Sequence, residues 1–202
     1  MIAIITGDII NSRKGKVENW LNALKETLNQ YGTEPKNWEI FRGDSFQLSI
    51  SPEKAILASL HIKSTIKQSK LHDARIAIGL GEEKYSSTTI SEANGSAYVN
   101  SGRCFDTLKK QTLAIMSPNK KFDQSINIML SLSLLTTNNW SSVVSEVIKT
   151  AIENPKNSQK SLAKLLNKSQ SSVSEALKRG GFEEIMYMNE FYKNNISSLC
   201  KT

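Results

Sequence analysis

The pattern of apolar and polar positions divides the chain into a strand-rich first part and a helical second part. Apolar runs and alternating segments predict strands at 2–6, 38–41, 46–50, 73–81 and 113–117. Apolar residues spaced three and four apart predict helices at 17–31, 51–70 and 91–109. This order of elements is typical of an α+β sandwich with helices on one face of a mostly antiparallel sheet.

After Pro118 the strand pattern ends and only helical spacing remains. We expect helices at 126–135 and 140–152, and a last amphipathic helix at 182–199 that suits either core packing or a dimer surface. The sequence therefore predicts two domains, an α+β domain at 1–118 and an all-α domain at 119–202. The second contains a candidate helix-turn-helix at about 158–180.

The segment 158–180 has the pattern of two short helices joined by a turn. Leu162, Leu165 and Leu166 are the expected buried stripe of the first helix, and Asn167 tolerates the left-handed conformation that the turn needs. We predict that the second helix begins at Ser169 and presents short polar side chains to a major groove, with basic residues near phosphates. The expected DNA-binding residues are Lys160, Lys164, Lys168, Ser169, Gln170, Ser171, Ser172, Ser174, Lys178 and Arg179. A helical pair used only for packing or dimerisation is the alternative.

The charge of the chain strengthens the DNA-binding interpretation. The formal net charge is +7, and six basic residues stand against the single acid Glu175 between positions 156 and 179. A basic cluster on a binding motif favours a polyanionic partner. The chain has no apolar run of the roughly 20 residues that would span a bilayer, so we expect no membrane partner. Cys104 and Cys200 lack metal or redox spacing, as in a reduced cytoplasmic protein.

Two aspartates form the second candidate site. Asp8 follows the first strand, and Asp44 lies in a hairpin turn between 38–41 and 46–50. If these strands are neighbours, the two carboxylates emerge at one edge of the sheet, where they and the carbonyl of Ile9 would hold Mg²⁺ and, through it, phosphate oxygens. Arg13, Lys14 and Arg42 are candidates for binding phosphate. Alternatively, both aspartates are turn formers beside glycine.

Four stretches resemble the SatD family of small bacterial proteins. They are Met-Ile-Ala-Ile-Ile-Thr-Gly-Asp-Ile-Ile-Asn-Ser-Arg at the start, Arg-Gly-Asp-Ser-Phe at 42–46, Ala-Arg-Ile-Ala-Ile-Gly at 74–79 and Ser-Gly-Arg-Cys-Phe-Asp at 101–106. The resemblance covers essentially the whole chain. It implies a nucleotide-cyclase-like domain of ferredoxin-like or palm type, with a βαββαβ order, followed by a C-terminal helix-turn-helix.

The same residues are more distantly similar to class III nucleotide cyclases and diguanylate cyclases. This likeness implies metal-binding roles for Asp8 and Asp44, and transition-state roles for Asn100 and Arg103. The chain departs from both patterns: Asn100 and Arg103 are three apart rather than four, Ile40 stands where cyclases select adenine with lysine, and the hairpin reads Arg-Gly-Asp-Ser-Phe.

We therefore expect a cytoplasmic DNA-binding regulator whose palm-like domain binds a Mg-nucleotide or dimerises. A two-fold homodimer is expected because helix-turn-helix proteins usually read paired half-sites. The alternatives are a Mg²⁺-dependent, cyclase-like enzyme that acts on a nucleoside triphosphate, and a structural adaptor in which both motifs are degenerate.

Overall fold

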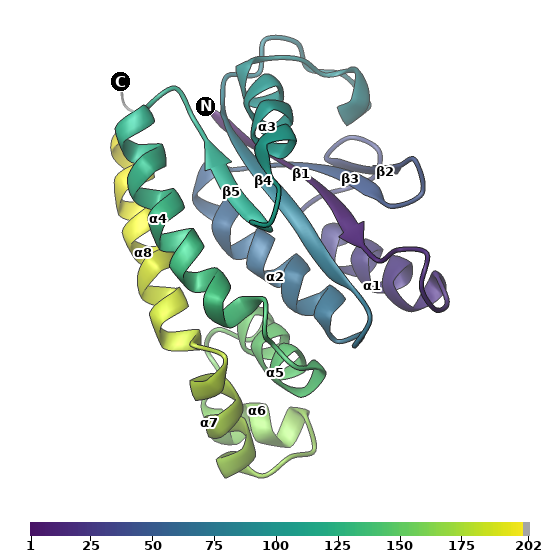
Figure 1. Ribbon diagram of the computed structural model, residues 1–202, viewed down its shortest axis with the longest axis vertical. Coiled ribbons are helices and arrows are strands. Elements are labelled where there is room, and N and C mark those ends of the chain that lie inside the picture. Colours follow the sequence, from purple (N-terminus) through teal and green to yellow (C-terminus); the bar gives the residue numbers. More distant parts are fainter. Residues whose placement is uncertain (200–202) are drawn as a thin grey trace.

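The computed structural model describes residues 1–199 as a five-stranded sheet flanked and extended by helices (Figure 1). The strands are β1 (Ile2–Ile10), β2 (Trp38–Phe41), β3 (Ser45–Ile50), β4 (Asp73–Gly81) and β5 (Leu113–Met116). The helices of the first part are α1 (Glu18–Asn29), α2 (Ala55–Lys67) and α3 (Ser96–Thr107), with short 3-10 turns η1 (Pro52–Lys54) and η2 (Ile90–Glu92). The helices that follow are α4 (Lys120–Thr137), α5 (Ser142–Glu153), α6 (Gln159–Leu165), α7 (Gln170–Arg179) and α8 (Phe182–Leu199). An α+β fold is thereby confirmed. None of these helices is long and apolar enough to cross a membrane.

The sheet is built around its first strand. The strand order is β2-β3-β1-β4-β5; the first four strands pair antiparallel, and β5 lies parallel to β4. Ala3, Ile4 and Ile5 are fully buried in succession because both faces of the sheet are covered at this strand. The sequence pattern predicted that β1 ends at position 6, but its ladders with β3 and β4 continue, so the strand runs to Ile10 and contains Asp8.

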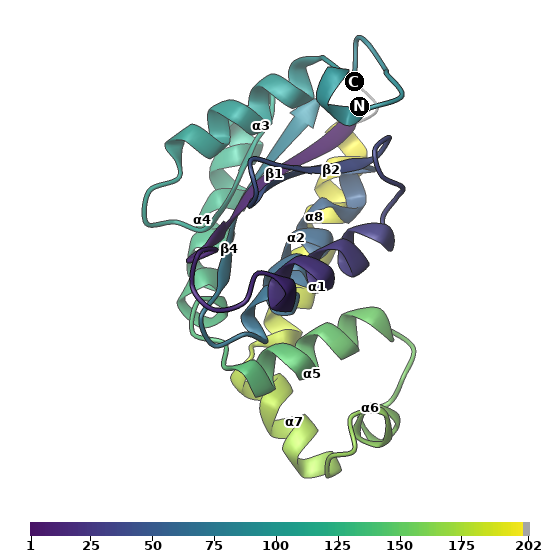
Figure 2. The same ribbon diagram turned by 90° about the vertical axis from the view of Figure 1, so that its right-hand side faces the viewer.

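Helices cover both faces of the sheet, whereas the sequence predicted helices on one face only. The helices α1 and α2 lie on one side and α3 on the other (Figure 2). On the α3 side, Thr6 Oγ1 donates a hydrogen bond to Ser101 Oγ at 3.0 Å. A Cβ atom at Gly79 would lie only 2.1 Å from the Ser101 backbone nitrogen. The prediction was wrong for α3. One face of β4 carries only Ala77, Gly79 and Gly81, so no large side chain prevents the backbone of α3 from packing closely against it.

The helical second part continues the same buried core. The helix α4 lies along the edge strand β5, where the Asn127 side chain bonds both the N–H and the carbonyl of Ile115 at 2.9 and 2.8 Å. The helix α8 returns antiparallel to α4, and Tyr192 Oη donates to the Pro52 carbonyl at 2.7 Å. One hydrophobic cluster extends from β1 to α8. The domain boundary proposed at residue 118 stays a prediction. The two parts that it would separate share this core.

A buried ion pair stands where the sheet meets the helical part. Lys63 on α2 donates to Asp73 Oδ1 at 2.8 Å and to Thr112 Oγ1 at 3.0 Å. Burial lowers the pKa of the Lys63 ammonium to about 8, and the Asp73 carboxylate offsets only part of this effect. Lys67 bonds the same carboxylate and also the carbonyl of Asn138, which lies between α4 and α5. The network therefore connects α2, β4 and the start of the helical part.

A second polar cluster joins α1 and α2 to α5. The phenol of Tyr31 and Nδ1 of His61 lie 2.9 Å apart, and His61 Nε2 lies 3.2 Å from Glu153 Oε1. Burial lowers the pKa of His61, and the Glu153 carboxylate offsets this only in part. Gln30 and Lys149 donate to the same Glu153 oxygen at 2.8 and 2.6 Å. The last turn of α5 is therefore fastened to the sheet-bearing half of the protein.

Candidate nucleic-acid interface and carboxylate rim

The segment predicted as a helix-turn-helix forms a compact three-helix unit with α5. The inner sides of α6 and α7 bury Leu162, Ala163, Val173, Ala176 and Leu177 against α5 and against each other. This unit extends beyond the end of the sheet, with α5 nearest the sheet and α6 and α7 farther from it (Figures 1 and 2).

The local sequence explains the turn and the start of α7. Asn167 adopts the left-handed conformation with φ of 50°, as expected from its position. Ser169 is the N-cap of α7, and its hydroxyl accepts from the Ser172 backbone N–H at 3.1 Å. The helix ends at Arg179, Gly180 follows as its C-cap, and Gly181 has a positive φ of 62°. The buried Trp140 indole donates to the Gly180 carbonyl at 2.9 Å and so fixes this end.

Nearly all of the predicted DNA-binding side chains lie on the surface. On α7, Gln170, Ser174 and Lys178 follow one another at helical spacing along the exposed side. The other exposed members are Lys160, Lys164, Ser169, Ser171, Ser172 and Arg179. The recognition-helix candidate is therefore open to a large partner along its whole length.

Two residues of the motif differ from expectation. Leu165 was predicted to be buried, but its side chain is 60% exposed. The prediction was wrong because α6 is only seven residues long and its inner side is already filled by Leu162 and Ala163. Lys168 is half-buried, and its ammonium forms a 3.0 Å ion pair with Glu146 on α5. A phosphate would have to compete with that carboxylate, so we expect Lys168 to contribute less than Lys164.

The backbones that carry the two aspartates meet at one end of the sheet, as predicted. Asp8 on β1 lies opposite Ser45, the residue after Asp44. The Ile9 N–H donates to the Asp44 carbonyl at 3.1 Å. Asp44 occupies the turn between β2 and β3, where Arg42 and Gly43 both have positive φ.

Each carboxylate nevertheless has a protein partner of its own. Arg75 lies opposite Asp8 on β4, and its Nη2 and Nε donate to the two Asp8 oxygens at 2.5 and 3.1 Å. These hydrogen bonds raise the pKa of the Arg75 guanidinium. The same guanidinium lies 4.9 Å from the centre of the Phe105 ring on α3. On the Asp44 side, Oδ2 accepts from the Ser12 hydroxyl at 2.5 Å.

The oxygen atoms that could bind a magnesium ion at this rim are of a suitable type, but they already accept hydrogen bonds within the protein. Carboxylate and carbonyl oxygens are the ligands that Mg²⁺ prefers. Here Arg75 and Ser12 bond the two carboxylates, and the Ile9 carbonyl accepts from the Ser12 N–H at 3.3 Å. Within residues 1–199, no group of three or more His, Cys, Asp or Glu side chains is placed to hold a metal ion. A cation that binds Asp8 would have to compete with the Arg75 guanidinium.

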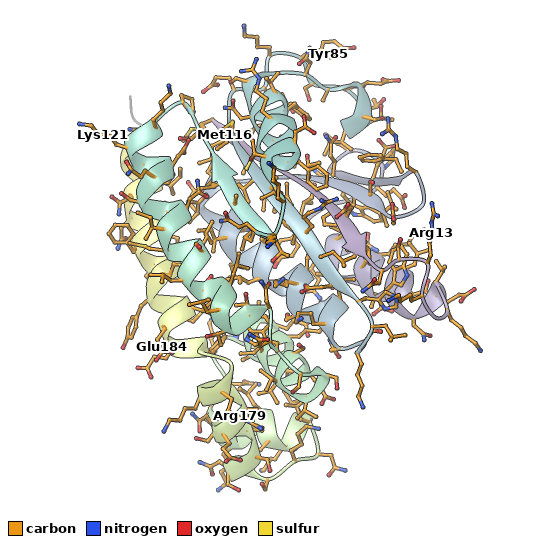
Figure 3. The ribbon with its side chains drawn as sticks, viewed as in Figure 1. Arg13, Tyr85, Met116, Lys121, Arg179 and Glu184 are labelled. Carbon is orange, nitrogen blue, oxygen red and sulfur yellow. The ribbon has the colours of Figure 1, made fainter. Side chains whose placement is uncertain are left out.

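The remaining predicted site residues lie around the rim or on α3. Arg13, Lys14 and Arg42 are exposed on the loops that flank Asp44, and Figure 3 shows Arg13 at the outer edge of the loop after β1. On α3, the Asn100 amide donates to the Leu80 carbonyl at 2.8 Å, while Arg103 is exposed. In this arrangement Asn100 supports the end of β4. The transition-state roles of Asn100 and Arg103 stay predictions.

Sequence reasoning missed Arg75, the residue that bonds Asp8. Its signal was a single cation within the otherwise apolar strand Ala74–Gly81. The contact between Arg75 and Asp8 follows from the register of β1 against β4, which sets these two residues opposite each other and which the sequence alone does not specify. His61, which lies in no recognisable sequence motif, is also buried and hydrogen-bonded.

Comparison with known proteins gives one family match. A family model described as the SatD family matches residues 1–195. A search of curated proteins found no match.

Proposed function

The chain belongs to the SatD family, and we propose that it is a cytoplasmic DNA-binding regulatory protein. In this proposal α7 enters the major groove, and the basic residues around α6 and α7 bind phosphates. The palm-like part, 1–118, senses a ligand or organises the dimer. The protein reads its operator as a two-fold pair of half-sites.

One observation carries this proposal. The inner side of α7 is fully packed, whereas its outer side exposes a polar row that begins at the N-cap, Ser169. Short polar side chains at this end can approach base edges, because no bulky residue holds the helix away from them. The exposed cations Lys160 and Lys164 on the preceding helix supply charge beside it. A helical pair that served only to pack would have little reason to keep both properties.

The test is the salt dependence of DNA binding, measured by fluorescence anisotropy with a labelled duplex. The logarithm of the binding constant should fall linearly with the logarithm of salt concentration, by about 0.9 for each phosphate contact. Lys164→Ala should therefore reduce the slope by about 0.9 and weaken binding to all sequences alike. Gln170→Ala should weaken binding only to the preferred sequence, because base contacts carry the specificity.

A matched control separates this effect from a change in net charge. Lys109→Ala removes the same charge from an exposed position in the connection between α3 and β5. It should leave both the affinity and the slope unchanged. No retention of DNA at low salt, or equal losses for Lys164→Ala and Lys109→Ala, would contradict the proposal.

A Mg-nucleotide site in the palm-like part is the second candidate function. The strand order β2-β3-β1-β4, with antiparallel pairing throughout, is the order expected for a βαββαβ palm. It favours this candidate because Asp8 and the Asp44 turn then share one end of the sheet. Binding of a nucleotide would require Asp8 to exchange Arg75 for the metal ion. The bound Mg²⁺ would neutralise phosphate charge, and Arg13, Lys14 and Arg42 would bind the phosphates.

A thermal-shift panel tests this second candidate. Each nucleoside triphosphate is added with Mg²⁺ or Mn²⁺, and any ligand that binds the folded state must raise the melting temperature. The rise should disappear in the Asp8→Ala and Asp44→Ala variants. Incubation with the same triphosphates, followed by product analysis, tests for a cyclase-like reaction. Activity that persists in both variants would exclude these residues as its metal ligands.

A further inference from the structure

A small hollow lies where the end of α2 meets the start of α5, and its volume is about 240 Å³. Figure 1 shows the two segments side by side at the end of the sheet nearest α6 and α7. One wall carries Lys67, Lys70 and His72, and the other carries Trp140, Ser141 and Ser142. We call this hollow the α2–α5 pocket. It lies at the junction between the sheet-bearing part and the helical part.

The charge of the α2–α5 pocket is positive. Lys70 is exposed at its mouth, whereas the Lys67 side chain is only 10% exposed. No acidic side chain of the described residues lines the pocket. The Asp73 carboxylate that Lys67 bonds is also bonded by Lys63, so the cations here outnumber the acid. The pocket therefore suits an anion, and two lysines suit an anion with two charges.

The ammonium of Lys67 is held in place and keeps one donor in reserve. It donates to Asp73 Oδ2 at 3.1 Å and to the Asn138 carbonyl at 2.8 Å. An ammonium group has three N–H donors. The third has no acceptor among residues 1–199, so it can bond an anion in the pocket without breaking either existing contact.

The start of α5 supplies further donors. Ser141 is the N-cap of this 12-residue helix, and its hydroxyl accepts from the Val144 N–H at 3.3 Å. The N–H groups of Ser142 and Val143 have no acceptor in the described part of the chain. The positive end of a helix dipole stabilises an anion at this position.

A buried hydroxyl beneath the pocket also lacks a partner. Ser145 is fully buried, and its Oγ has no hydrogen-bond partner within residues 1–199. It lies three and four positions after Ser142 and Ser141, on the same side of α5. Helix side chains lean toward the N-terminus, so the Ser145 hydroxyl points toward the pocket. Buried polar groups without partners are uncommon, and this one indicates that a polar occupant completes the site.

The two walls are rigid. His72 Nε2 donates to the Lys14 carbonyl at 2.8 Å, because that oxygen can only accept, and its Nδ1 then accepts from the Ser69 hydroxyl at 2.7 Å. Opposite, the Trp140 indole is fixed by its hydrogen bond to the Gly180 carbonyl at 2.9 Å. The pocket is therefore formed before any ligand arrives, as binding sites usually are.

We propose that the α2–α5 pocket binds a phosphoryl group, supplied as inorganic phosphate or as a small phosphate ester. A phosphate dianion matches the two lysines, and its several oxygens match the ammonium, hydroxyl and backbone N–H donors that converge here. A carboxylate carries one charge and two oxygens and would leave donors unused. The volume lies below the roughly 300–1,000 Å³ of pockets that enclose larger ligands, so the pocket encloses the phosphoryl group and little more.

The site deepens the proposed function by giving the sensing part a ligand class, and only this step rests on that function. Trp140 lines the pocket and is bonded to the C-cap of α7. A phosphate that bonds both walls fastens α5 to α2 and so reduces the ordering that DNA binding must impose. Phosphate and DNA should therefore each strengthen the binding of the other.

The test is isothermal titration calorimetry of the DNA-free protein in Hepes buffer at fixed ionic strength. Inorganic phosphate and ribose 5-phosphate should bind, and ribose should not. Tighter binding of ribose 5-phosphate would identify an ester as the ligand, and equal binding would identify phosphate itself. Absence of binding by both phosphate compounds would overturn the proposal.

Two variants locate the site. Lys70→Ala removes a charge at the mouth, and Ser142→Pro removes an N–H and a hydroxyl at the first helical position, where proline is tolerated. Each should weaken phosphate binding about tenfold, the value of one charge-assisted hydrogen bond. Lys36→Ala, before β2, and Gln159→Pro, at the first position of α6, make the same changes elsewhere and should bind as wild type.

The remaining outcomes separate this site from the DNA interface. Wild-type affinity in both Lys70→Ala and Ser142→Pro would overturn the proposal. So would a loss of phosphate binding in Lys164→Ala that Lys70→Ala does not share, because the anion would then occupy the helix-turn-helix. Since calorimetry is done without DNA, a protein that binds phosphate in the pocket but no DNA would refute the proposed function and leave this inference intact. A protein that binds DNA but no phosphate would do the reverse.

Discussion

The burial of the Lys63 ammonium beside Asp73 predicts that the contribution of Lys63 to the stability of the folded protein increases as the pH rises from 7 to 10. Burial lowers the pKa of Lys63 from 10.5 to about 8 in the folded protein. Between these values the unfolded chain binds a proton that the folded protein has released, so the free energy of unfolding rises with pH. The stabilisation is complete above the unfolded pKa and is lost as the pH falls through the folded pKa.

The magnitude follows from the two pKa values. At about 1.4 kcal/mol per pKa unit, Lys63 should add about 2–3 kcal/mol to the free energy of unfolding between pH 7 and pH 10. Burial raises the pKa of the Cys104 thiol to about 12 and also raises the pKa values of the Tyr31 and Tyr98 phenols, and these three groups oppose the trend at the alkaline end of the range. The contribution of Lys63 is therefore measured as a difference between two proteins that share these three groups.

The comparison is with Lys63→Met, which keeps the length of the side chain. Asp73 retains Lys67 and the Ala74 N–H as partners, at 3.1 and 2.8 Å, so its carboxylate is not left bare. Urea unfolding at pH 7 and pH 10 should show that wild type gains about 2–3 kcal/mol more than Lys63→Met. Lys70→Met, at the exposed end of the same segment, should behave as wild type. Parallel pH profiles for wild type and Lys63→Met would refute the reasoning.

Three further predictions concern the turn, the end of α7 and the rim. Asn167→Ala should lower the free energy of unfolding by about 1 kcal/mol and Asn167→Gly should not, because only alanine is strained at φ of 50°; urea titration checks both. Trp140→Phe removes the donor for the Gly180 carbonyl and should cost about 1–3 kcal/mol by the same assay, with an unchanged result indicating that water replaces the indole. Arg75→Ala frees Asp8 and should enlarge the rise in melting temperature caused by Mn²⁺; an equal rise in wild type would show that Arg75 does not compete with the metal.

Local patterns predicted the elements, and pairing between distant residues decided the site. The strand at 73–81 and the left-handed Asn167 were predicted correctly because alternation and turn chemistry act over a few residues. The Arg75–Asp8 contact spans 67 positions and depends on strand register, which no local pattern specifies. The placement of α3 depends on Gly79 and Gly81, where the absence of a Cβ atom lets the helix approach β4. In the sequence these two glycines indicated only the end of a strand.

The side chain of Leu165 shows a related limit. Its spacing suits a buried stripe, but α6 is too short to turn three leucines inward, and helix length is the least certain part of a periodicity argument. The charge of Lys168 was equally visible in the sequence, whereas its partner Glu146 lies 22 positions earlier on another helix. The fold was therefore needed to identify the basic side chains that remain available to bind DNA.

The anchoring of α8 has a mechanical consequence. Because Tyr192 bonds the Pro52 carbonyl and Glu153 contacts His61, the segment with α6 and α7 leaves the body and returns to it through two fixed points. A domain joined by one flexible linker can rotate freely, whereas this segment is attached to the rest of the protein at both of its ends. The orientation of α7 can therefore change only if the sheet-bearing part, to which α5 and α8 are both attached, changes its own conformation.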